Sequence, residues 1–256
     1  MHMLNPHCGV DRDSRGVVRL TICNAGSLNI LGTPVISGVR EGLQALADDR
    51  EIRVLVLAGQ SEKSMIGGAD IKEMAKLEQK SAEKFITGLR DLCEAVRAFP
   101  GPVIARMPGW CLGGGLEVAA ACDFRIAAHD AKFGMPEVRV GIPSVIHAAL
   151  LPRLIGWGRA RWLVMTAENI DAATALAWGL IDRVAPPGGL DATVEQTVAM
   201  LLECSPEALR AQKDLLRQWE ELPLKESVDL SIGVFGQSYL TGEPQRLMLD
   251  FVNRKR

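Results

Sequence analysis

The chain has 256 residues, of which 48% are hydrophobic and 23% are charged, and its formal net charge is −2. This size fits one large domain, or a core with a small appendage, in an ordinary soluble globular protein. The balanced charge argues against a general nucleic-acid binder, although a local site could still hold a small anion. The first ten residues lack the apolar stretch of a secretory signal, and no apolar run approaches the roughly 20 residues of a membrane span. We therefore expect a cytoplasmic protein.

The six cysteines and four histidines are scattered through the chain, and no two cysteines form a C-x-x-C pair. Zinc sites and disulfide frameworks need closely spaced or regularly paired residues. We therefore expect free thiols in a reducing compartment and no metal site.

Apolar runs of strand length and amphipathic runs of helical length alternate through the first part of the chain. Strands are expected at 17–23, 53–58, 103–107, 123–127 and 132–134, and helices at 33–48, 81–99 and from 116 to about 121. Thr33 is expected to cap the first of these helices, because a proline follows it in the first turn. The alternation predicts an α/β fold built from repeated ββα or βαβ units.

The run Pro186-Pro187-Gly188-Gly189 marks the clearest boundary in the sequence. Beyond it the pattern is helical only, with helices expected at 190–203, 205–221, 224–240 and 244–254. We divide the chain into an α/β core at 1–189, which carries the active site, and a helical region at 190–256. The second part is too small to be an obvious independent domain, so we expect it to pack against another subunit.

Three consecutive glycines, Gly113–Gly115, join the predicted strand at 103–107 to the helix that follows. Such a junction presents free backbone N–H groups with the positive end of the helix dipole behind them. No Lys-Ser/Thr follows, and the spacing is not that of a dinucleotide-binding fingerprint, so a phosphate loop is excluded. A plain structural turn is the simpler interpretation of the glycines alone, but Glu117 follows within one helical turn, so this is where a chemical role is sought.

A second acid, Glu137, lies 20 positions after Glu117. One strand and a return loop fit into that distance, so both carboxylates could reach a single cleft and act as acid and base. The alternative from spacing alone is two solvated surface residues.

Five segments together carry a family resemblance. They are Gly-Gly-Ala-Asp-Ile-Lys-Glu (67–73), Leu-Gly-Gly-Gly-Leu-Glu (112–117), Ala-Cys-Asp-Phe-Arg-Ile-Ala (121–127), Phe-Gly-Met-Pro-Glu (133–137) and Ala-Trp-Gly-Leu-Ile-Asp-Arg-Val (177–184). In this order they resemble the crotonase (enoyl-CoA hydratase/isomerase) superfamily, from about Arg15 to the C-terminus. The resemblance implies a spiral of ββα units with a C-terminal helical trimerisation region.

The resemblance also implies which residues form the site. The backbone N–H groups of Ala69 and Gly114 match the oxyanion hole for a CoA thioester, and Glu117 and Glu137 match the two catalytic glutamates of the hydratase subgroup. Positions that match the CoA and substrate contacts are Ser27, Leu28, Gly68, Asp70, Ile71, Lys72, Gly113, Phe251 and Lys255.

The activity implied by both glutamates is that of an enoyl-CoA hydratase, a lyase that adds water to a 2-enoyl-CoA and gives a 3-hydroxyacyl-CoA. Coenzyme A is part of the substrate, so no separate cofactor is expected. The expected partner is the chain itself, as a homo-oligomeric trimer or dimer of trimers. The alternatives are another reaction of an acyl-CoA (isomerisation, decarboxylation or hydrolysis) and a non-catalytic binder of CoA thioesters.

The segment 140–153 departs from the family pattern. The usual Leu-Gly-x-x-Pro-Gly-x-Gly-Gly-Thr-Gln-Arg is replaced by a run that is apparently one residue shorter and lacks most of those glycines. By resemblance, the acyl pocket is formed by Trp110, Val145, Ile146 and His147, in place of small residues. We therefore predict a preference for short or unusual enoyl groups, the alternative being a re-routed segment and a wider cleft.

Ser144 and His147 lie three residues apart and would be near each other on one helix, as in a hydrolase nucleophile–base pair. No Gly-x-Ser-x-Gly elbow surrounds the serine. The simpler interpretation is that Ser144 caps a helix and His147 packs.

Overall fold

The computed structural model describes residues 1–253, and the chain divides into two compact units, Met1–Leu202 and Glu203–Arg256. The division falls after Leu202 rather than after residue 189, where the sequence places it. The reason is that helix α7 (Leu190–Leu202) packs against strands of the first unit and buries Leu190, Val194 and Val198.

The first unit contains a seven-stranded sheet in the order β1-β2-β3-β4-β6-β8-β11. Its strands are β1 (His2–Asn5), β2 (Cys8–Arg12), β3 (Val17–Ile22), β4 (Val54–Gly59), β6 (Val103–Met107), β8 (Phe124–Ala128) and β11 (Arg183–Ala185). The β1–β2 and β2–β3 pairs are antiparallel, and all pairs from β3 onward are parallel. Every residue of β4 and of β6 is buried, so both faces of the middle of the sheet are covered.

A second sheet of four short strands has the order β10-β9-β7-β5. They are β5 (Ser64–Ile66), β7 (Trp110–Leu112), β9 (Lys132–Gly134) and β10 (Ile170–Asp171). Of these, only β9 is predicted from the sequence. Strands of two or three residues give too little periodicity to be recognised without their partners.

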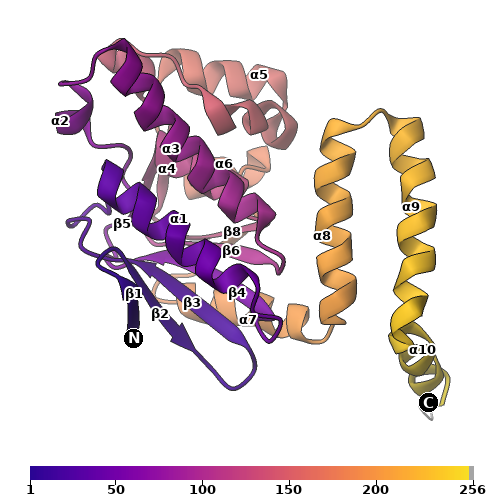
Figure 1. Cartoon of the computed structure of the whole chain (residues 1–256). Coiled ribbons are helices and arrows are strands. Elements are labelled where there is room, and N and C mark those ends of the chain that lie inside the picture. The colour runs from indigo at the N-terminus through magenta and orange to yellow at the C-terminus, as the bar shows by residue number, and fades with distance from the viewer. Residues whose placement is uncertain (254–256) are drawn as a thin grey trace. The chain divides into compact units, whose positions relative to one another are not determined.

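The helices of the first unit are α1 (Thr33–Ala47), α2 (Ile71–Met74), α3 (Gln79–Ala98), α4 (Gly114–Ala121), α5 (Leu151–Thr166), α6 (Ala172–Trp178) and α7, together with the 3₁₀ helices η1 (Glu137–Val140) and η2 (Ile146–Leu150). Figure 1 shows α1 and α3 side by side beside the large sheet, and the two helices contact each other. The predicted α/β architecture is confirmed, and the predicted strands and helices lie within one or two residues of the observed ones.

Thr33 is not the N-cap of α1, which is Gly32. The N–H of Thr33 instead donates to Glu73 Oε2 at 2.9 Å, and its hydroxyl donates to Glu73 Oε1. A carboxylate from the next helix therefore satisfies the free donors at this helix start.

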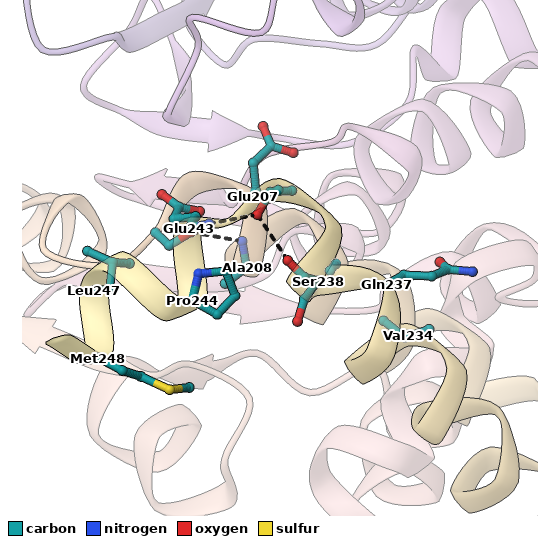
Figure 2. A pocket seen from close by; sticks show the side chains of 12 residues that line it. Glu207, Ala208, Val234, Gln237, Ser238, Glu243, Pro244, Leu247 and Met248 are labelled. Carbon is teal, nitrogen blue, oxygen red and sulfur yellow. Dashed lines mark hydrogen bonds between the residues drawn. The ribbon is translucent and has the colours of Figure 1, made fainter.

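The second unit consists of α8 (Pro206–Glu221), α9 (Leu224–Ser238), the 3₁₀ helix η3 (Tyr239–Thr241) and α10 (Glu243–Asn253). Ser205 caps α8 by accepting from the N–H of Ala208 at 3.1 Å, and its hydroxyl donates to Glu243 Oε2 at 2.5 Å. A cavity of about 380 Å³ lies among these helices, with Val234, Leu247 and Met248 among the side chains around it (Figure 2).

No helix within residues 1–253 is both long and apolar enough to cross a membrane.

Candidate active site

The glycine turn lies between β7 and α4, and two of its positions require glycine, Gly115 because of a backbone contact and Gly113 because of its positive φ. A side chain at Gly115 would place Cβ 2.4 Å from the carbonyl oxygen of Ile66, on the neighbouring strand β5. Gly113 has φ +51° and a Cβ there would lie 2.3 Å from Oε1 of Glu137. The turn therefore needs glycine both to pack on β5 and to adopt a positive φ beside the second glutamate.

The turn at Gly68–Ala69 lines the same cavity as the glycine turn. Gly68 has φ +119°, and its carbonyl accepts from the N–H of Leu31 at 2.9 Å. Asp70 caps α2 by accepting from the N–H groups of Lys72 at 2.8 Å and Glu73 at 3.1 Å. These bonds fix the backbone on both sides of Ala69.

Two backbone donors at these turns stay available. Within residues 1–253, neither the N–H of Ala69 nor that of Gly114 donates a hydrogen bond. Both residues line one cavity of about 350 Å³. An N–H group that is buried without an acceptor destabilises the fold, whereas one that faces a cavity can donate a hydrogen bond to a ligand.

Glu117, in the first turn of α4, has a side chain that lines this cavity although the residue is only 4% exposed. The N–H of Ala148, in η2, donates to its Oε1 at 3.0 Å. Burial raises the pKa of Glu117 to about 8, the Ala148 bond opposes this shift, and the charge of Glu137 adds to it.

Glu137, at the start of η1, lines the same cavity and is half-buried. The hydroxyl of Ser144 donates to its Oε2 at 2.9 Å. Burial also raises the pKa of Glu137, while the bonds from its own backbone and from Ser144 lower it. Because the pKa of Glu117 is raised to about 8, this glutamate retains a proton near neutral pH.

The cavity brings together eight of the residues predicted from the sequence. They are Gly68, Ala69, Ile71, Gly113, Gly114, Glu117, Glu137 and Val145. Apolar side chains such as Met74, Phe85, Leu89 and Ile142 form most of the remaining wall. Pockets of this volume with a few convergent polar groups are typical of small-molecule sites.

Other predicted site residues lie elsewhere. Four of them do not line the cavity, namely Ser27, Leu28, Asp70 and Lys72. The carbonyl of Leu28 nevertheless accepts, at 2.7 Å, from the N–H of Gly67, which does line it. Phe251 is in α10, in the second unit, and is exposed. Lys255 lies outside the described residues.

Three of the four residues predicted for the acyl pocket do not line the cavity. Trp110 is 40% exposed on β7, whereas His147 is buried and its Nε2 lies 2.8 Å from Glu94 Oε1. Ile146 has a φ of +38°, a conformation that turns the chain at this point. Only Val145 faces the cavity, so the prediction for Trp110, Ile146 and His147 is not supported by their positions.

The hydrolase alternative also depends on this segment. The Ser144 hydroxyl is bonded to Glu137, and the His147 imidazole is bonded to Glu94, so each contacts a different carboxylate. Ser144 caps no helix, because Val145 is the N-cap of η2. The hydrogen bonds that Ser144 and Ala148 donate to the two glutamates could not be predicted from the sequence. The only indication is that both residues lie in the segment that departs from the family pattern.

The profile of the enoyl-CoA hydratase/isomerase family matches residues 12–256, nearly the whole chain. The chain belongs to the enoyl-CoA hydratase/isomerase family. The short-chain-enoyl-CoA hydratase of Clostridium acetobutylicum is 31% identical over 94% of this chain and 92% of its own length. The crotonyl-CoA hydratase of Syntrophomonas wolfei is 32% identical over 90% of this chain and 89% of its own.

Solved structures of this family have the same fold. The crystal structure of an enoyl-CoA hydratase from Mycobacterium smegmatis superposes with a TM-score of 0.94 at 28% identity, covering 98% of both chains. One from Bacillus anthracis gives a TM-score of 0.92 at 28% identity over 97% of both chains. The crotonase-like fold expected from the sequence is therefore confirmed.

Proposed function

We infer that the chain is an enoyl-CoA hydratase, a hydro-lyase that adds water across the double bond of a 2-enoyl-CoA and forms a 3-hydroxyacyl-CoA. The observation that carries this inference is that two glutamates, one buried and one half-buried, and two unpaired N–H groups meet at one cavity. The names of the relatives in Clostridium acetobutylicum and Syntrophomonas wolfei support the same reaction.

The proposed role of Ala69 and Gly114 is to hold the thioester oxygen. Negative charge develops on this oxygen when water attacks the β-carbon, because the electron pair of the double bond moves toward the carbonyl. The two N–H groups donate to that charge, and Gly114 also lies at the N-terminus of α4. Loss of one such donor in an enzyme costs roughly 2.7–4 kcal/mol of transition-state stabilisation.

The proposed role of Glu117 and Glu137 is to hold and divide one water molecule. The oxygen of the water bonds to the β-carbon, and its proton passes to the ionised carboxylate. The proton already held by the other carboxyl passes to the α-carbon. The pair therefore ends with one proton, as it began, which suits a site in which Glu117 holds a proton near neutral pH.

The proposed position of coenzyme A is along the Gly68–Lys72 turn and the neighbouring Ser27–Leu28 loop. The bond between the Gly67 N–H and the Leu28 carbonyl places these two segments side by side, which supports the proposal. Coenzyme A enters as part of the substrate, and the proposed reaction needs no other cofactor.

We also propose a cytoplasmic homo-oligomer, a trimer or a dimer of trimers. Large apolar side chains are exposed on the helices of the second unit, among them Leu224, Ile232, Phe235 and Leu240. Apolar surface of this extent is typical of an interface with another protein. The six free thiols suit a reducing compartment.

The test is to mix the protein with crotonyl-CoA, to follow the absorbance of the conjugated thioester, and to determine the mass of the product. We expect the absorbance to fall and the product to be crotonyl-CoA plus one water. Release of free coenzyme A would identify a hydrolase instead. Binding of crotonyl-CoA without any change in absorbance would identify a non-catalytic binder.

A further inference from the structure

The carboxyl group of Glu137 is held asymmetrically. Its Oε2 accepts the hydrogen bond from Ser144 Oγ at 2.9 Å. Its Oε1 lies at the glycine turn, where even a Cβ on Gly113 would approach it to 2.3 Å. One oxygen is therefore occupied by the hydroxyl, and the other is presented to the turn that carries the Gly114 N–H.

The segment that carries Ser144 is itself fixed at several points. The N–H of Ala148 is bonded to Glu117, and His147 Nε2 lies 2.8 Å from Glu94 of α3. Between them and Ser144, Ile146 has a φ of +38°, which neighbouring contacts must maintain because a β-branched residue disfavours it. The Ser144 hydroxyl is thus held in place on a constrained backbone.

A serine at this position belongs to the part of the chain that departs from the family pattern, in which a glycine follows the proline. Glycine has no side chain that could reach the carboxylate. The hydrogen bond to Glu137 is therefore a consequence of this chain's own sequence at Pro143-Ser144.

We propose that Ser144 is a positioning residue for Glu137: its hydroxyl holds Oε2, directs Oε1 toward the glycine turn and favours the ionised carboxylate. The proposal rests on the proposed hydratase function. A hydroxyl donates more strongly to a carboxylate than to a neutral carboxyl, so the bond favours the form that can take a proton from water.

The consequence of losing the hydroxyl can be worked out in sign. Without this donor, the carboxylate is less stabilised, so the pKa of Glu137 rises further above its ordinary value. The acidic limb of kcat/KM then moves to higher pH, because a higher pH is needed to ionise the base. The orientation of Oε1 is also lost, which lowers kcat at every pH.

The experiment compares Ser144→Ala with Ser144→Thr, which keeps a hydroxyl. For Ser144→Ala we expect kcat on crotonyl-CoA to fall roughly tenfold or more, KM to change by less than about threefold, and the acidic limb to move to higher pH. Ser144→Thr is expected to keep the acidic limb of the original protein. A merely structural role would lower the active fraction without moving the limb, and an unmoved limb in Ser144→Ala would overturn the proposal.

Two further measurements separate this proposal from the hydratase assignment. In a Glu137→Gln background, Ser144→Ala is expected to cause little additional loss, because Ser144 acts through Glu137. An equal loss in both backgrounds would overturn the proposal. The pKa of Glu137 is measured directly by ¹³C NMR of glutamate-labelled protein, with its signal assigned by its absence in Glu137→Gln.

The NMR titration requires no activity. We expect a higher Glu137 pKa in Ser144→Ala than in the original protein, and equal values would overturn the role of the hydroxyl. If the original protein fails to hydrate crotonyl-CoA, the hydratase assignment fails, while the titration still decides whether Ser144 controls Glu137.

Discussion

At the scale of single residues, the burial of Glu117 is the most consequential feature. The residue is 4% exposed and receives one N–H donor, from Ala148. A carboxyl in this environment is more stable with its proton than without it. The burial that allows Glu117 to hold a proton also means that its ionised form destabilises the folded state.

Stability should therefore depend on pH through Glu117. Its pKa rises from 4.5 to about 8 on folding. Because its pKa is higher in the folded than in the unfolded state, Glu117 contributes fully to stability below the unfolded-state pKa. This contribution is lost as the pH rises through the folded-state pKa. At about 1.36 kcal/mol per pKa unit, the free energy of unfolding falls by at most about 5 kcal/mol over this window, relative to Glu117→Gln. Urea unfolding of both proteins at pH 5 and pH 8 checks this, and parallel pH dependences would contradict it.

At the scale of elements, the active site depends on the close packing of α4 on β5. A Cβ at Gly115 would meet the Ile66 carbonyl oxygen at 2.4 Å, and backbone atoms at this place cannot move aside cheaply. We expect Gly115→Ala to destabilise the fold by about 1–3 kcal/mol, and to reduce hydratase activity by displacing the Ala69 turn that follows β5.

A matched control for this substitution is Gly158→Ala in α5. Gly158 is exposed, and a Cβ there meets no atom within 4 Å. Alanine should stabilise a helix by up to about 1 kcal/mol relative to glycine. Thermal and denaturant unfolding of the two variants measures the difference. Equal stabilities would show that α4 and β5 tolerate a larger separation.

The altered segment 140–153 also bears on the acyl group that the cavity accepts. Only Val145 of the four predicted residues lines the cavity. The predicted preference for short acyl chains therefore rests on the volume of the cavity, about 350 Å³. We predict a higher kcat/KM for a four-carbon than for a ten-carbon enoyl-CoA. Each methylene that does not fit is worth roughly 1–3 kcal/mol. A clear advantage for the ten-carbon substrate would show that the segment leaves a wider cleft.

The sequence predicts the glycine turns and Glu117, because a strand–turn–helix junction is local and its residues are near each other in the chain. Glu137 lies outside this junction, and its role is predicted from the family resemblance. The sequence does not predict the contacts that hold the glutamates. Ala148 reaches Glu117 across 31 residues, and the segment that carries Ala148 is itself held by the contact of His147 with Glu94, across 53 residues. Such contacts depend on how the 140–150 segment turns, and the turn at Ile146 requires a φ that its residue type disfavours.

At the scale of the whole molecule, the second unit leaves several large apolar side chains exposed. Leu224 is 81% exposed and Leu240 is 87% exposed. We predict that the protein sediments as a trimer or a dimer of trimers at micromolar concentration. Substituting aspartate for Ile232 and Phe235 should weaken the assembly, whereas Gly158→Ala should leave it unchanged. A monomer of the original protein under these conditions would contradict the interface.

The most direct measurement of the central claim is the turnover of Glu117→Gln and Glu137→Gln on crotonyl-CoA, with Glu41→Gln, an exposed glutamate of α1, as the control. If the two carboxyls divide one water, each site variant loses at least about 100-fold in kcat. Binding of the unreactive butyryl-CoA, measured by calorimetry, should change little in any variant. Full activity in Glu137→Gln would contradict the two-carboxylate hydratase mechanism.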